Sequence, residues 1–209
     1  MDEIIDLITS RSDFFLKLLI EHLQISLISI LLAIFFGLII GIIISEYQKT
    51  SKIIMSIVNF VYTIPSISLL GFLIPLSGIG DTTAIIALTI YALLPMVRNT
   101  HTGITNVNPL LVEAATGMGS TKFQILYKIK LPLAIPVIIA GIRNMAVMTI
   151  SLAGIASFIG AGGLGVAIYR GITTNNKAMT IVGSLIIAVL AIITDLIVGF
   201  IENKIKHYK

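Results

Sequence analysis

The sequence predicts an all-α integral membrane protein with five transmembrane helices. Of its 209 residues, 56% are hydrophobic and only 11% are charged, whereas a soluble domain carries about 25% charged residues. A globule of this length cannot bury so much apolar surface, because a small body keeps a large share of its residues at its boundary. The apolar residues also lie in runs that can each cross a bilayer, which takes about 20 residues of helix.

Five apolar segments are long enough to be spans. The second is interrupted by Pro65, which removes a backbone donor and should kink the helix, either for gating or for packing alone. Asp81 opens the third, and we expect it to cap that helix. The predicted spans are Ile25–Ile44, Ile53–Leu76, Asp81–Val97, Ile135–Ile159 and Ala178–Ile201.

The basic residues of the connecting segments predict the orientation of the chain, because cytoplasmic loops are enriched in Lys and Arg. Nine lie on one side of the predicted spans and four on the other, which places the N-terminus outside and the C-terminus inside. The predicted organisation is an external segment (1–22), a transmembrane domain (23–201) with a cytoplasmic loop (98–134), and a cytoplasmic tail (202–209). The net charge of +4 forms no basic stripe, so nucleic acid is not an expected partner.

Two charged residues lie inside predicted spans, where charge is costly. Counted from the inner ends of their spans, Arg143 lies about 12 Å deep and Asp195 about 9 Å deep. Because the depths match, we expect an ion pair or a shared contact with a polar seam. The alternative is that each side chain reaches separately toward the lipid headgroups.

The cytoplasmic loop predicts a helical hairpin. Asn108 can cap free backbone N–H groups, and Pro109 suits the first helical position. A short helix over Leu110–Met118 should follow and end at Gly117 or Gly119.

A second short helix is predicted directly after the first. Thr121 and Gln124 have the spacing of a capping box. We expect Pro132 to stop this helix before the fourth span. Its apolar face would consist of Phe123, Leu126 and Ile129. An ordinary amphipathic surface loop is the alternative interpretation.

The segment EAATGMGSTKFQILYKIKLP resembles the EAA loop of binding-protein-dependent ABC importer permeases. Other stretches are similar to the osmoprotectant branch of that family, which handles glycine betaine, carnitine, choline and related compounds. These are YTIPSISLLG, YALLPMVRNTHTGI, AGIR and FIGAGGLG, and Tyr62 departs from the pattern, in which glutamine is common. The EAA positions are Glu113, Ala114, Ala115, Gly119, Ile129, Leu131 and Pro132.

The resemblance implies a type I ABC importer permease in the cell membrane of a prokaryote. It implies that the EAA positions contact a separate ATPase subunit and transmit its closure to the pore. The implied partners are ABC ATPase subunits, a second permease that is identical or paralogous, an external substrate-binding protein and membrane lipid. The sequence has no GxxxxGK[ST] phosphate loop. We therefore expect a transport subunit that is not an enzyme and carries no cofactor, with ATP bound by the partner.

A possible gate or pathway is indicated by aromatic residues and glycines near the span ends. The aromatic rings could attract a quaternary ammonium by cation–π interaction or could simply pack. The glycines could line an irregular pathway segment or allow close helix approach. The residues are Tyr62, Pro65, Tyr91, Phe158, Gly160, Gly162 and Gly163.

Two short motifs point to other chemistry but lack its context. The segment 160–165 satisfies GxGxxG, yet it follows an apolar span and not a strand, which excludes a dinucleotide site. The segment 78–81 matches the GxGD of intramembrane aspartyl proteases, but about 20 Å of bilayer should separate Asp81 from Asp195. With no Cys and no His pair at ligand spacing, we expect no metal site. The rival interpretations are a self-sufficient secondary transporter or channel, a membrane enzyme, and an ABC permease for another cargo or for export.

Overall fold

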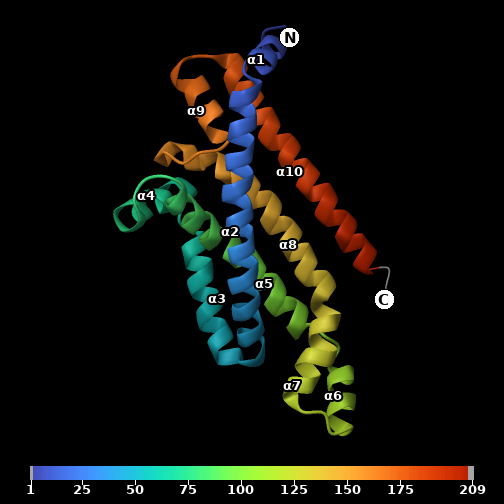
Figure 1. Cartoon of the computed structure of the whole chain (residues 1–209). Helices are drawn as coiled ribbons and strands as arrows, with labels where there is room; N and C mark the ends of the chain where they lie inside the picture. Colours follow the sequence, from blue (N-terminus) through green and yellow to red (C-terminus); the bar gives the residue numbers. More distant parts are fainter. Residues whose placement is uncertain (1, 207–209) are drawn as a thin grey trace.

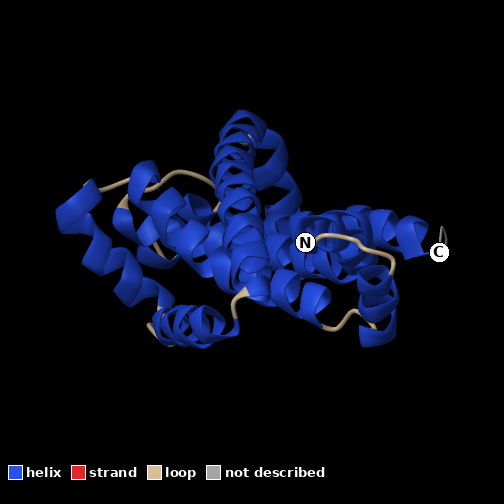
Figure 2. Cartoon of the chain, turned by 90° about the horizontal axis from the view of Figure 1, so that it is seen from below, coloured by secondary structure: helices blue, strands red, loops and turns tan. Residues whose placement is uncertain are grey.

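A computed structural model describes residues 2–206, and every regular element within them is a helix (Figures 1 and 2). Residues 207–209 of the predicted tail lie outside the described residues. The elements are α1 (Asp2–Ser10), α2 (Ser12–Glu46), α3 (Gln48–Tyr62), α4 (Ser66–Ser77), α5 (Asp81–Thr105), α6 (Pro109–Gly117), α7 (Lys122–Ile125), a π-helical turn (Leu126–Lys130), α8 (Leu131–Ala153), a 3₁₀ segment (Gly154–Ile159), α9 (Gly165–Thr173) and α10 (Lys177–Lys206).

Four helical stretches are long and apolar enough to cross a membrane: α2, α5, the stretch from α7 through α8, and α10. The predicted second span is divided into α3 and α4, which meet at an angle of 98°. The described residues therefore hold four candidate spans, or five if the bent pair crosses as one.

The bend between α3 and α4 lies at Pro65, as the sequence predicts. Pro65 has an extended ψ of 140° and precedes the first residue of α4. The break leaves carbonyl groups of the last turn of α3 without a helical donor. The Tyr91 hydroxyl of α5 donates a hydrogen bond to the carbonyl of Ile64, which lies between the two helices, so the neighbouring helix satisfies a carbonyl group of the break.

Helix α2 lies close to α5 along a seam of small residues. Ser29, Ala33, Gly37 and Gly41 follow one another at four-residue spacing and are all buried. A Cβ atom at Gly37 would lie 2.5 Å from Met96 Cγ, and one at Gly41 would lie 2.5 Å from Thr100 Cβ. Lipid tails are as apolar as the side chains, so such close packing is what holds membrane helices together.

The opposite side of α5 packs against α8, again through glycines. A Cβ atom at Gly141 of α8 would lie 2.5 Å from Asn99 Cβ, and one at Gly103 of α5 would lie 3.2 Å from Ala134 Cβ. Helix α5 is thus enclosed between α2 and α8 and forms the centre of the bundle.

Pro132 does not stop the second hairpin helix, and this part of the sequence prediction is wrong. The π-helical turn connects α7 directly to α8, and Pro132 lies in the first turn of α8. A π turn widens the backbone, which relieves the clash of the proline ring with the preceding turn. The second hairpin helix and the fourth span are therefore one continuous helix.

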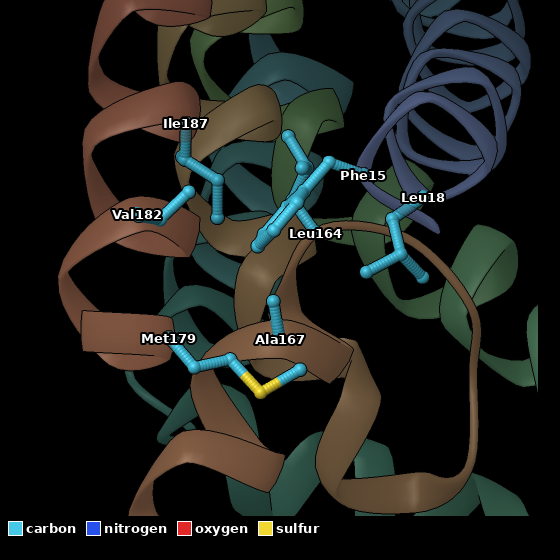
Figure 3. Packing of buried hydrophobic residues seen from close by; sticks show 7 residues of the cluster. All are labelled: Phe15, Leu18, Leu164, Ala167, Met179, Val182 and Ile187. Atoms are coloured by element: carbon cyan, nitrogen blue, oxygen red, sulfur yellow. The ribbon is translucent and has the colours of Figure 1, made fainter. Parts of the chain in front are cut away.

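A hydrophobic cluster packs α2 against α9 and α10. Figure 3 shows Phe15 and Leu18 of α2 packed with Leu164 and Ala167 at the start of α9 and with side chains of α10. The N-terminus and α9 lie at one end of the bundle, and α6 and α7 project from the other (Figure 1).

The close packing along the seam predicts that replacing Gly41 or Gly71 by alanine has different effects on the stability of the folded chain. We expect Gly41→Ala to lower the stability of the folded chain by about 1–3 kcal/mol, because the new methyl group would force α2 away from α5. Thermal unfolding of the detergent-purified chain measures this.

The matched control for that measurement is Gly71→Ala in α4, where an added Cβ would meet nothing within 4 Å. Equal thermal stability of the two variants would contradict the proposed importance of the seam.

Candidate functional site

Two short helices, α6 and α7, follow α5; we call them the hairpin, and the first has both expected end signals. The side chain of Asn108 accepts a hydrogen bond from the Leu110 N–H, and Pro109 occupies the first turn of α6. At the other end, the N–H groups of Gly119 and Ser120 donate to the carbonyls of Thr116 and Ala115, respectively. This bonding is a Schellman motif, and it requires the left-handed φ of +84° at Gly119. Glycine is needed here for its backbone conformation, since a Cβ would have open space.

The second helix begins with the predicted capping box. The Thr121 N–H donates to Gln124 Oε1 at 2.8 Å, and the Gln124 N–H donates to Thr121 Oγ1 at 3.3 Å. The predicted apolar face is divided: Leu126 packs into the bundle, whereas Phe123 is 74% exposed. Its ring stacks on that of Tyr127, which is also exposed.

The EAA residues of α6 point in two directions. Glu113 and Ala114 are exposed, and Glu113 forms no ion pair among the described residues. Ala115 is only 1% exposed. This methyl group packs inside the hairpin, and the implied contact of Ala115 with an ATPase subunit stays a prediction.

An open groove of about 510 Å³ runs between the end of α6 and the second helix. The backbone turn at Gly119 forms one wall, and Ile129 from the π-helical turn forms part of the other. Met118 lies on its rim and is 80% exposed. Ser120, Gln124 and Lys128 also line the groove, so the hairpin presents a partly concave surface of mixed polar and apolar character at the end of the molecule.

An ion pair that the sequence prediction lacks anchors the hairpin to the bundle. Lys130 Nζ lies 2.7 Å from Glu46 Oε1, at the end of α2. Both side chains are partly buried. Leu131, at the junction with α8, packs into the core between α2, α5 and α8. Pro132 follows it on the exposed side.

Three of the predicted gate residues meet at the bend between α3 and α4. The rings of Tyr62 and Tyr91 pack edge to face, with centroids 5.8 Å apart. Tyr91 is buried and its hydroxyl is held by the carbonyl before Pro65. Tyr62 is 42% exposed, and its hydroxyl lies 3.4 Å from Met148 Sδ of α8. Of the two rings, only that of Tyr62 is open to a passing molecule.

The remaining gate residues lie at the end of the bundle opposite the hairpin. Phe158 packs edge to face on Tyr169 of α9, with centroids 5.2 Å apart. Its neighbour Ile159 packs in one cluster with Tyr91 and Leu69. Ile159 therefore connects the residues at the α3–α4 bend with those around Phe158.

The glycine loop before α9 is held by carboxylates. The Gly162 N–H donates to Asp81 Oδ1 at 2.8 Å, and the Gly163 N–H donates to Glu21 Oε2 at 3.1 Å. Asp81 therefore does not cap α5 as expected. Gly80 is the N-cap residue, and the Asp81 carboxylate is engaged by the loop.

The structure brings Arg143 and Asp195 together. Nε and Nη2 of Arg143 each lie 2.6 Å from a carboxylate oxygen of Asp195, a bidentate arrangement. Nη1 lies 3.3 Å from Glu202 Oε2. Gly199 lies between the two acids on α10, and its missing side chain leaves room for the guanidinium, since a Cβ there would lie 3.0 Å from Arg143 Cζ.

Glu202 was not among the predicted residues, although its spacing could have indicated it. On a helix, residues three or four apart share a face, and Asp195, Gly199 and Glu202 have that spacing. Glu202 was assigned to the tail because the predicted fifth span ends at Ile201, whereas α10 continues to Lys206. Asp81 and Asp195 take part in separate contacts, on Gly162 and Arg143, and form no dyad.

These elements define a helical membrane bundle with a rigidly attached hairpin at one end. The chain matches the family model of the binding-protein-dependent transport system inner membrane component over residues 33–207. It belongs to that family and is a multi-pass membrane protein.

Curated relatives in two bacteria are similar over most of their length. A glycine betaine/carnitine/choline transport system permease of Bacillus subtilis, OpuCB, is 41% identical over 88% of this chain and 85% of its own length. The carnitine transport permease OpuCD of Listeria monocytogenes is 35% identical over 100% of this chain and 94% of its own length.

Solved structures agree in fold. One chain of the MetNI methionine ABC transporter, in an inward-facing conformation, superposes with a TM-score of 0.85 at 23% identity, covering 91% of this chain and 95% of its own. A chain of an amino acid ABC transporter superposes with a TM-score of 0.80 at 20% identity, covering 94% and 96%. The fold is thus that of ABC importer permeases.

The ion pair between α8 and α10 predicts that the effects of replacing Asp195 and Arg143 on folding are not additive. Asp195→Leu alone should harm folding more than Asp195→Leu combined with Arg143→Met, because the single change leaves the guanidinium in lipid without its bidentate partner. The yield of monodisperse protein in mild detergent measures this.

Glu202 provides the internal comparison for that experiment. Since it makes one longer contact to the same guanidinium, Glu202→Gln should be milder than Asp195→Leu. Equal damage from the single and double replacements would count against pairing.

Proposed function

We propose that this chain is the permease subunit of an ATP-driven importer of compatible solutes such as glycine betaine, carnitine and choline. The observation that carries the proposal is 35–41% identity, over most of both chains, to permeases of such systems in two bacteria. The permease binds no ATP. Partner ATPase subunits supply the hydrolysis, and the bundle alternates between access from inside and from outside.

The hairpin is the proposed ATPase contact. Its end of the molecule carries exposed apolar side chains at Met118 and Phe123 and an open groove. Glu113 and Ala114 would touch the partner directly, whereas Ala115 and Gly119 shape the hairpin from within. The continuous helix through the π-helical turn and the Lys130–Glu46 ion pair would carry the movement of the hairpin into α8 and α2.

The proposed orientation places the hairpin in the cytoplasm and the N-terminus outside. The basic residues Lys122, Lys128 and Lys130 belong to the hairpin, as the positive-inside rule requires. The bent pair α3–α4 counts as one of five spans in this topology. The glycine loop then faces outward.

A second permease would complete the pathway. The backbone between Tyr62 and Ser66 is not helical, and Tyr62 and Pro65 are exposed on this chain. Irregular backbone at membrane depth is tolerated only where protein or a water-filled cavity covers it. A second copy or a paralogue facing α3–α4 would cover this backbone with protein and enclose a water-filled cavity beside it. An external binding protein would deliver the solute.

The same architecture could serve a different cargo. A Helicobacter pylori protein with an ergothioneine transport permease is 38% identical over 83% of this chain, although the match covers only 31% of that protein. Export, secondary transport and channel activity are the competing functions, and each makes a different demand on ATP and on the binding protein.

Uptake by reconstituted vesicles tests the function. The permease with its ATPase and binding protein should accumulate radiolabelled glycine betaine, carnitine or choline only when ATP is enclosed with the ATPase side. Ergothioneine is the comparison cargo. Flux that follows an ion gradient without ATP would contradict the proposal.

The hairpin assignment predicts a graded mutational series. Ala114→Leu should reduce binding-protein-stimulated ATP turnover by about ten-fold or more, because an exposed small residue at a protein contact cannot be enlarged without loss of fit. Stimulated ATPase activity of the complex measures this.

Gly117→Ala is the matched control, because an added Cβ there meets nothing within 4 Å. Ala115→Leu should instead unfold the hairpin, since its site is filled. Full coupling in Ala114→Leu would remove α6 from the proposed interface.

A further inference from the structure

Two glycine-rich turns meet at the end of the bundle opposite the hairpin, and the proposed function gives them no role. One is the turn between α4 and α5, residues 78–81, and the other is the loop before α9, residues 160–165. The Gly80 N–H donates to the carbonyl of Ile159 at 3.1 Å. The Gly162 N–H donates to Asp81 Oδ1 at 2.8 Å. The two motifs thus bind each other.

A carboxylate from a third part of the chain binds the neighbouring amide. Glu21 of α2 accepts the Gly163 N–H at 3.1 Å. Two consecutive N–H groups of one loop are therefore held by acids from two different helices, α5 and α2. We call Asp81, Glu21, Gly162 and Gly163 the outer latch.

The latch depends on the absence of side chains in the loop. Gly163 has a φ of +90°, and a Cβ there would lie 3.1 Å from the Cα of His22. A Cβ at Gly162 would lie 2.6 Å from Glu21 Oε2. A side chain at Gly163 would push the loop away from α2, and one at Gly162 would displace the Glu21 carboxylate, so the glycines explain how the carboxylates reach the backbone.

The hydrogen bonds of the latch have carboxylate acceptors, and water can reach them. Hydrogen bonds from N–H groups to carboxylates are stronger than neutral ones. Asp81 is nevertheless exposed, and Glu21 and Gly162 line an open pocket of about 400 Å³ together with Lys17 and Arg170. Water that enters this pocket can replace each bond when the helices separate.

We propose that Asp81 and Glu21 are positioning residues of the transport cycle, which hold the outer ends of α2, α5 and α9 together at rest and release them when the outer side opens. The inference rests on the proposed function, because only an alternating-access permease has an outer side that opens. Weakening the latch shifts the resting population toward the outward-open state. That state is the one in which the ATPase pair closes, so ATP turnover without binding protein should rise.

The test uses the whole transporter in vesicles, with ATP turnover measured in the presence and absence of binding protein. Asp81→Ala should raise the binding-protein-independent rate by about ten-fold, the change expected for loss of one hydrogen bond to a charged group. Asp81→Asn keeps an acceptor and should raise it less. Asp13→Ala, which removes an exposed acid at the same end of α2, should leave it unchanged. An unchanged or lower rate in Asp81→Ala would overturn the proposal.

A cross-link tests whether the two turns must separate, because it replaces the hydrogen bond between positions 81 and 162 with a covalent bridge. The chain has no cysteine, so Asp81→Cys combined with Gly162→Cys can be bridged selectively by a short thiol-reactive cross-linker. Bridging should abolish uptake, and cleavage of a reducible bridge should restore it. Wild-type uptake by the bridged protein would show that the latch need not open.

The readouts separate failure of the latch from failure of the proposed function. If the unmodified transporter shows no ATP-dependent uptake, the proposed function fails. If it does and the latch variants keep low basal turnover, the latch alone fails. Should Asp81→Ala not fold, Gly162→Ala replaces it, because its methyl group displaces only the flexible end of Glu21 and leaves both charges in place.

Discussion

The close approach of α2 to α5 is the contact on which the centre of the bundle depends. It is made by Gly37 and Gly41, which leave no side chain between the helices. In lipid, burial of apolar surface does not by itself drive helices together, so contact at short range must do it. The same helix α5 then receives α8 through Gly141 and supplies Tyr91 to the broken backbone before Pro65. A shift of α5 would therefore disturb both the bundle and the bend.

Polar contacts hold the elements together at both ends of the bundle. At the hairpin end, Lys130 and Glu46 join the π-helical turn to the last turn of α2. At the other end, Asp81 and Glu21 hold the glycine loop against α5 and α2. Helix α2 takes part at both ends, and its 35 residues form one unbroken helix. In the proposed mechanism, a movement of the hairpin would therefore reach the opposite end of the bundle through this one helix.

Ala115 and Tyr91 show why a motif does not reveal the role of each of its residues. Both belong to segments that carry the family resemblance, and both are buried in this chain. Ala115 fills the interior of the hairpin, and the Tyr91 hydroxyl satisfies a carbonyl at a helix break. The neighbours Ala114 and Tyr62 are the exposed members. In the proposed function, those exposed residues would contact a partner or a solute, and the buried ones would set their positions.

The helical class, the approximate spans, the bend at Pro65 and the end signals of α6 and α7 were all predictable from the amino-acid sequence, because they follow from local composition and from hydrogen bonds between near neighbours. The pairing of Arg143 with Asp195 was also predictable, from the similar distances of the two residues to the ends of their predicted spans. Three other outcomes required the folded chain: Glu202 joins that pair, Asp81 binds Gly162 and does not cap its own helix, and the helix continues through Pro132. They depend on which groups approach from elsewhere in the chain and on a local widening of the backbone. Residue spacing places Glu202 on the same helix face as Asp195, but it does not show that Glu202 meets Arg143.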